Sequence, residues 1–256
     1  MHAPSDLPAV AADVLARIRG RRPRVHCITN AVAQNFTPNL LLAAGAVPSM
    51  TIAPDEIAAF IARADALLVN LGTLDPERRA AIDLAVTAAG ERVPWVLDPV
   101  LIDRSPPRAT LAATLVARHP RAIRLNAAEF QTLAGAEPSA EVVACYAAAQ
   151  ACVIGLTGGR DVVADGARSI AILNGDPLMA KVTAMGCAAS ALLAACLAVE
   201  PDGWRATVAS LVIIGVAGEV AAARALGPGT FAAAILDALH GLDEQTILQR
   251  ARLEPS

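Results

Sequence analysis

Polar side chains follow several short apolar runs of this sequence, at the points where buried strands would end. They are Asn30, Asn70, Asp98, Asn126 and Thr157. Ligands of an open parallel sheet bind beyond the carboxyl ends of its strands, so we expect these side chains to face one crevice. Any one of them could instead cap the helix that follows, as asparagine and aspartate often do. Capping explains the whole set less well, and the set therefore predicts a binding site.

Two carboxylates of this region, Asp98 and Glu129, could hold a magnesium ion. Glu129 stands three residues after Asn126. Mg²⁺ keeps most of its water and needs one or two protein carboxylates together with phosphate oxygens. The two carboxylates therefore indicate a nucleotide site.

A second candidate feature is the stretch Lys181–Ala188, a loop that opens a helix of small residues. Backbone N–H groups and the positive dipole end at a helix amino terminus suit a phosphoryl group in transfer. Cys187 would sit there, and we expect its thiol pKa to be lowered, so that it can orient or deprotonate a substrate hydroxyl. The alternative interpretation is a small buried cysteine that begins a core helix.

Known phosphate-binding signatures are missing from the sequence. It contains no Gly-x-x-x-x-Gly-Lys-[Ser/Thr] stretch and no protein-kinase motif, so phosphate binding would need a different architecture. Two glycines after Thr157 offer a flexible turn at the end of a strand.

The elements that would position these residues alternate between short apolar runs and alanine-rich helical segments. This alternation predicts an α/β fold with a mostly parallel sheet. The predicted strands are residues 24–29, 47–50, 66–70, 94–97, 122–125 and 152–156. The predicted helices among them are residues 31–44, with Pro38 as a kink or restart, 55–62 and 77–89.

The pattern changes after Asp161. Residues 162–166 and 168–173 predict a hairpin around Asp165-Gly166, and hence an antiparallel edge of the sheet. Apolar helices near residues 187–199, 204–225 and 230–239 then predict an all-helical wrap for the C-terminal third. No repeat or linker interrupts the chain, which favours one domain over residues 1–256.

Composition excludes several classes of protein. The 256 residues carry a formal net charge of -3, without the basic surplus that nucleic-acid binding needs. The uncharged run at residues 182–199 is built from small residues and has no aromatic belt, so we interpret it as a buried helix and expect no membrane span.

The N-terminus and the cysteines favour a cytoplasmic protein. Charged residues interrupt any apolar core in Met1–Arg22, which argues against a secretory signal. Five cysteines are an odd number and lack Cys-x-x-Cys spacing, which argues against a disulfide framework or a zinc site.

Taken together, these stretches resemble the hydroxyethylthiazole kinase family of the ribokinase-like superfamily, whose members phosphorylate 4-methyl-5-(2-hydroxyethyl)thiazole for thiamine salvage. The resemblance is nearly full-length, and VHCITN (25–30) and WVLDPV (95–100) are its most specific parts. Further matching stretches are residues 35–36, 42–50, 64–67, 70–74, 123–129, 157–158, 165–166, 174–175, 181–183, 186–187 and 227–231.

The resemblance implies a three-layer α/β/α kinase of the ribokinase-like fold that uses magnesium and ATP. It also implies a homotrimer with active sites at the subunit boundaries. Acceptor contacts are carried over onto Asn30, Met50, Gly72 and Ala184, ATP contacts onto Arg124, Asn126, Thr157 and Gly186, and magnesium ligands onto Asp98 and Glu129. Cys187 matches the cysteine near the substrate hydroxyl, where related sugar kinases carry an aspartate base.

The chain departs from the family pattern at three places. The usual Gly-Thr-Gly-Cys reads Ala184-Met185-Gly186-Cys187, Leu125 replaces a glycine, and Ala128 replaces a serine. If the backbone at Ala184 needs a positive φ, an alanine there costs about 1 kcal/mol. The Met185 side chain could also crowd the phosphate.

The resulting hypothesis is ATP-dependent phosphorylation of the thiazole alcohol. Two alternatives keep the fold: a kinase for another small heteroaromatic alcohol, and a nucleotide-binding paralogue with weakened catalysis. A third is an ATP-dependent lyase of the same superfamily, which Cys187 and residues 95–100 fit less well.

Overall fold

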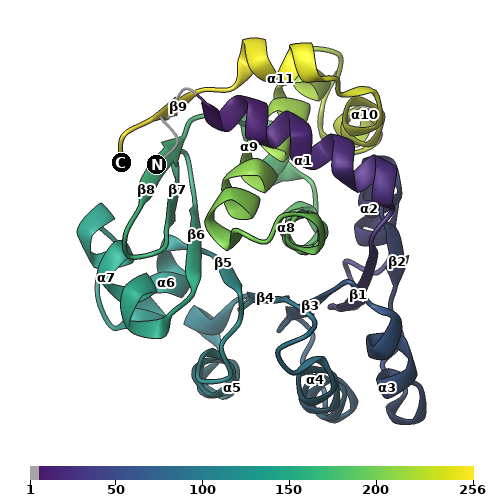
Figure 1. Ribbon diagram of the computed structural model, residues 1–256, viewed down its shortest axis with the longest axis vertical. Helices are drawn as coiled ribbons and strands as arrows, with labels where there is room; N and C mark the ends of the chain where they lie inside the picture. The colour runs from purple at the N-terminus through teal and green to yellow at the C-terminus, as the bar shows by residue number, and fades with distance from the viewer. Residues whose placement is uncertain (1–5) are drawn as a thin grey trace.

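A nine-stranded sheet forms the centre of the computed structural model, which describes residues 6–256 (Figure 1). Its strand order is β2-β1-β3-β4-β5-β6-β7-β8-β9. Neighbours from β2 to β6 pair in parallel, and β7, β8 and β9 are added antiparallel. The strands are β1 Arg24–Ile28, β2 Val47–Ser49, β3 Ala66–Asn70, β4 Trp95–Asp98, β5 Ala122–Asn126, β6 Val153–Thr157, β7 Asp161–Ala164, β8 Ser169–Ile172 and β9 Leu253–Glu254. The predicted parallel set and the predicted hairpin are both confirmed.

Helices cover both faces of the sheet. Figure 1 shows α1, α2, α8 and α9 on one face and α3, α4 and α5 on the other. The helices are α1 Leu7–Arg21, α2 Phe36–Ala44, α3 Pro54–Arg63, α4 Pro76–Ala89, α5 Pro106–Val116, α6 Ala127–Ala134, α7 Ala140–Gln150, α8 Met185–Val199, α9 Gly203–Ala222, α10 Pro228–Gly241 and α11 Glu244–Arg250. Two short 3-10 helices, η2 Ile102–Arg104 and η3 Pro177–Lys181, lie in connections.

Alternation of side chains along the strands produces two separate cores. In β4, Val96 packs into the core under α1, α8 and α9, while Leu97 packs into the core shared with α3, α4 and α5. Leu68 and Val69 of β3 divide in the same way, because successive strand residues point to opposite faces. The three-layer α/β/α architecture is therefore confirmed.

The small residues of α8 allow it to be buried on all sides. It lies against β1, β3 and β4 and is covered by α1, α2 and α9. This position explains the uncharged run at residues 182–199 without a membrane. Within the described residues, α9 is long and apolar enough to cross a membrane, but 78% of its apolar window is buried inside the molecule, as in a core helix.

The structure corrects two predicted elements and adds one helix. Helix α2 begins at Phe36, after a turn, so Pro38 lies in its first turn, where a missing N–H costs nothing, and causes no kink. The C-terminal third is not all helical, because β9 pairs with β8. Helix α1 occupies most of the segment Met1–Arg22, for which the sequence pattern predicted no helix or strand; the first five residues of that segment lie outside the described residues.

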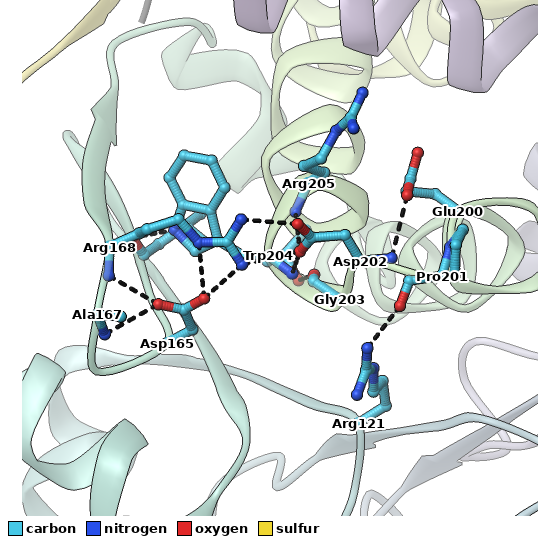
Figure 2. A network of polar contacts seen from close by, with 12 residues as sticks. Arg121, Asp165, Ala167, Arg168, Glu200, Pro201, Asp202, Gly203, Trp204 and Arg205 are labelled. Carbon is cyan, nitrogen blue, oxygen red and sulfur yellow. Dashed lines mark hydrogen bonds and ion pairs between the residues drawn. The ribbon is translucent and has the colours of Figure 1, made fainter. Parts of the chain in front are cut away.

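Hydrogen bonds and ion pairs connect the β7–β8 hairpin to the segment between α8 and α9, at the amino ends of the parallel strands (Figure 2). Arg168 donates to Asp202 at 2.6 Å and also pairs with Asp165. Its guanidinium lies 4.6 Å from the ring centroid of Trp204, whose Nε1 donates to the Val163 carbonyl at 3.2 Å. This network holds the antiparallel edge in place, at the end of the sheet opposite to the predicted crevice.

Candidate active site

A cavity of about 500 Å³ opens at the carboxyl ends of β4, β5 and β6, against the amino end of α8. It brings together most of the predicted site residues, from segments far apart in the sequence. Those that line it are Asp98, Arg124, Asn126, Glu129, Thr157, Ala184, Gly186 and Cys187. The predicted crevice is therefore present, where the sheet topology requires it. Of the five strand-end side chains expected to face it, Asp98, Asn126 and Thr157 do so, whereas Asn30 and Asn70 do not line it.

Glu129 and Asn126 cap a helix and also line this cavity. Asn126 accepts a hydrogen bond from the Glu129 N–H, and Glu129 Oε2 accepts from the Asn126 N–H, both at 3.0 Å, in a capping box for α6. Glu129 Oε1 accepts from the Leu101 N–H at 2.8 Å. Capping and ligand binding are thus compatible, because backbone donors hold the buried carboxylate rigidly at the cavity wall.

Asp98 is the second carboxylate of the cavity and is 4% exposed. Burial raises its pKa to about 6; the charge of Arg124 acts to lower it, and the charge of Glu129 to raise it. Within the described residues, no group of three or more histidine, cysteine or acidic side chains could hold a metal. Two carboxylates beside a cation do fit a magnesium ion held partly by water and phosphate oxygens.

Arg124 supplies a positive charge beside the amino end of α8. Its Nη1 donates to the Gly186 carbonyl at 3.1 Å, and its buried Nε has no hydrogen-bond partner among the described residues. Thr157, on the neighbouring strand, donates from its hydroxyl to the Leu125 carbonyl at 3.3 Å. The unpaired Nε suits an anionic ligand, because a buried donor without a partner is costly.

The Cys187 thiol differs from our expectation. Burial and the nearby Asp98 charge raise its pKa to about 11, against the weaker lowering effects of the Asn30 and Asn70 amides and of Arg124. The expectation of a lowered pKa was wrong, since loss of water outweighs the helix dipole here. Cys187 is therefore a protonated thiol at neutral pH and can orient a hydroxyl, but it is a poor base.

The remaining acceptor-side residues, Asn30, Gly72 and Met50, do not line this cavity. Asn30 is buried, and its Nδ2 lies 3.1 Å from Cys187 Sγ. Gly72 packs directly against the Asn30 side chain: a Cβ at position 72 would lie 2.7 Å from the Asn30 Cβ, so a larger residue does not fit there. Met50 follows the edge strand β2 and packs, partly buried, against the core on the α1 face.

Two of the three departures from the family pattern, the Ala184-Met185 pair and Leu125, border the cavity. Ala184 is the N-cap residue of α8 and has φ 70° and ψ 0°, so the condition for a backbone cost is met. Met185 is buried in the core and also contributes to the cavity wall. Leu125 is buried in the opposite core and borders the same cavity.

Sequence reasoning missed two polar residues of the cavity, Asp161 and Asn174. Asp161 accepts from the Gly158 N–H at 2.8 Å, and burial raises its pKa. Asn174 donates to Glu219 at 2.9 Å and to the Arg250 carbonyl at 2.8 Å. The Asn174-Gly175 pair just after the predicted hairpin was the available signal; Asp161 had none beyond its place at the hairpin start.

The cavity is surrounded by two buried carboxylates, a cation and the amino end of a helix. These groups can bind and stabilise a phosphoryl group, and on this three-layer α/β/α fold they are typical of a phosphotransferase. Comparison with known proteins defines the family. The model of the Hydroxyethylthiazole kinase family matches residues 15–245. The chain belongs to this family and is a kinase.

Individual relatives agree with this assignment. A "Probable hydroxyethylthiazole kinase" of Agrobacterium fabrum is 44% identical over 96% of this chain and 95% of its own length. The structure of the hydroxyethylthiazole kinase protein of Pyrococcus horikoshii OT3 superposes with a TM-score of 0.93 at 35% identity, covering 97% of this chain and 99% of that one. A ribokinase-like superfamily protein of Enterococcus faecalis, 13% identical with a TM-score of 0.71 over 91% of this chain and 95% of its own, shares the fold.

Proposed function

We propose that this kinase transfers the γ-phosphoryl group of magnesium-ATP to the primary hydroxyl of 4-methyl-5-(2-hydroxyethyl)thiazole. One observation carries the proposal: within this family fold, a single cavity joins the carboxylate pair to Cys187 and the amino end of α8. The nucleotide would occupy the side of Arg124, Asn126 and Thr157, and the alcohol the side of Cys187. The comparisons favour neither alternative hypothesis, a kinase for another heteroaromatic alcohol or a nucleotide-binding paralogue with weakened catalysis.

Phosphoryl transfer depends mainly on positioning and on stabilisation of charge. Asp98 and Glu129 would hold magnesium, which neutralises charge on the phosphates when bound. Arg124 and the backbone N–H groups at Gly186 and Cys187 would stabilise the transferring phosphoryl group. Cys187, as a neutral thiol, would orient the attacking hydroxyl by hydrogen bonding.

The acceptor contacts of Asn30, Met50, Gly72 and Ala184 belong to this proposal, as does assembly into a homotrimer. The edge strand β2 and its neighbourhood support an association: Val32 is 64% exposed and Leu42 57%, and Val47 is also exposed. A neighbouring protomer on this edge would cover these apolar side chains and complete the acceptor side near Met50. Five free cysteines favour the cytoplasm.

The test is detection of the phosphorylated thiazole by mass spectrometry after incubation of the purified protein with magnesium, ATP and the thiazole alcohol. We expect product from the wild-type protein and much less from the Arg124→Ala variant. Pyridine and pyrimidine methanols serve as competing acceptors. Product from one of these alone would replace the acceptor, and ATP binding without any product would support the weakened paralogue.

A further inference from the structure

Asn70 does not line the cavity, yet its side chain touches residues from both sides of it. It is the last residue of β3, is 1% exposed and stands in register with Asp98 of β4. Asn70 Nδ2 donates to Asp98 Oδ2 at 2.7 Å. Asn70 Oδ1 accepts from Asn30 Nδ2 and from the Gly72 N–H, both at 3.0 Å. Both ends of this buried amide are therefore used.

Asn30 continues the connection to the acceptor side. Its Nδ2 also donates to Cys187 Sγ at 3.1 Å, and its Oδ1 accepts from the Ala33 N–H at 3.0 Å. Asp98, Asn70, Asn30 and Cys187 thus form a continuous series of hydrogen bonds, which we call the amide chain. Its three hydrogen bonds join four segments of the fold: β4, β3, the turn after β1 and α8.

An amide is the side chain that these neighbours demand at position 70. The Asp98 carboxylate accepts, whereas the Gly72 N–H donates, so the residue between them must donate at one end and accept at the other. Aspartate could accept from Gly72 but would place a second carboxylate against Asp98. Leucine has the same shape but neither function. The partners also determine which way the amide points.

We propose that Asn70 is a positioning residue for phosphoryl transfer: its amide holds Asp98 on the nucleotide side and, through Asn30, Cys187 on the acceptor side, in one fixed mutual arrangement. The proposal rests on the kinase function proposed above. Because Asn70 is outside the cavity, it does not touch substrate itself and acts through Asp98, Asn30 and Cys187. A displacement of reacting groups by about 1 Å can lower a rate about 100-fold.

The test compares Asn70→Leu with a control at the opposite end of the sheet. We expect Asn70→Leu to lower kcat about 10- to 100-fold while both KM values change less than about threefold. Asn70→Asp keeps an acceptor for Asn30 and Gly72 but sets a second carboxyl group against Asp98. The two groups must share a proton or repel each other, so the charge and position of the Asp98 carboxylate change and kcat should also fall. Trp204→Phe deletes another buried hydrogen bond, to Val163, and should lower the Tm without changing kcat.

A crystal structure of Asn70→Leu gives a second readout that needs no acceptor. The distance from Asn30 Nδ2 to Cys187 Sγ, or that from Cys187 to Asp98, should lengthen relative to the wild-type protein. Wild-type kcat in a folded Asn70→Leu or Asn70→Asp variant overturns the proposal, and so does an unmoved Asn30, Cys187 and Asp98. If Asn70→Leu does not fold, Asn70→Asp decides. If the wild-type protein makes no product, the proposed function fails, and the variant structure still tests the amide chain.

Discussion

Replacing Ala184 by glycine tests the strain at the amino end of α8. Ala184 has φ 70°, where a Cβ crowds the backbone at a cost of about 1–2 kcal/mol. Glycine removes this cost, but it also makes the unfolded chain more flexible, which lowers stability by about 0.4–1 kcal/mol. We therefore expect Ala184→Gly to be neutral or to stabilise the protein by up to about 1 kcal/mol.

Two further alanines separate the native-state strain from the unfolded-state effect. Ala151, which ends α7 with φ 49°, has the same left-handed conformation far from the site, while the exposed Ala149 lies within that helix. All three substitutions change the unfolded chain equally, so their differences report the folded state. Ala149→Gly should destabilise by about 1 kcal/mol, the usual cost in a helix.

The assay is urea denaturation followed by circular dichroism, at one protein concentration so that any association contributes equally. Ala184→Gly should be about 1–2 kcal/mol more stable than Ala149→Gly, with Ala151→Gly close to the former. The partly buried methyl of Ala184 reduces its gain by a few tenths of a kcal/mol. Equal destabilisation by Ala184→Gly and Ala149→Gly would refute the reasoning.

Three other predictions follow from the ionisable groups. Because the folded pKa of Asp98 is raised from 3.8 to about 6, the free energy of unfolding falls by about 3 kcal/mol as pH rises across that window. Asp98→Asn should therefore unfold at a higher temperature than the wild-type protein at pH 7.5 but not at pH 4, and it should form less product. A difference in Tm that does not depend on pH would count against this explanation. The Cys187 thiol should react with iodoacetamide about tenfold more slowly at pH 8 than a free cysteine peptide, since a pKa of about 11 leaves little thiolate. Mass spectrometry of the labelled peptide measures the reaction rate. A rate equal to or above that of the free peptide would contradict the raised pKa. Burial acts to raise the pKa of Asp202, but its hydrogen bonds, above all that from Arg168, lower the pKa below 3.8 overall. Arg168→Met should therefore destabilise the protein at pH 7, and this loss should shrink as pH falls from 3.8 through the lowered folded pKa, below which the carboxyl is protonated. An equal loss of Tm at pH 7 and well below pH 3.8 would exclude the ion pair as the cause.

Much of the architecture could be predicted because hydrophobic periodicity is a local property. The apolar run Ala66–Asn70 is observed as a strand over the same residues, and Asp165-Gly166 does turn a hairpin. Elements without a strong local pattern were missed. The two residues of β9 form a strand only because β8 offers an unpaired edge.

The site residues divide in the same way. The strand-end pattern predicts Asp98 and Glu129 at one crevice, since parallel strands bring their carboxyl ends to one edge, whereas the family resemblance alone pointed to Arg124. Asp161 was missed, because only the return of β7 beside β6 carries it there. The conditional cost at Ala184 could be stated from the sequence, but its φ could be known only from the fold.

The amino-acid sequence by itself determined the alternating α/β order, the parallel set, the family and the residue types at the strand ends, because each depends on neighbours along the chain. Tertiary structure decided the protonation of Cys187 and the amide chain through Asn70. Both depend on which groups are close in space and how much water remains between them: burial raises the thiol pKa to about 11 at a helix end where sequence alone favours a thiolate.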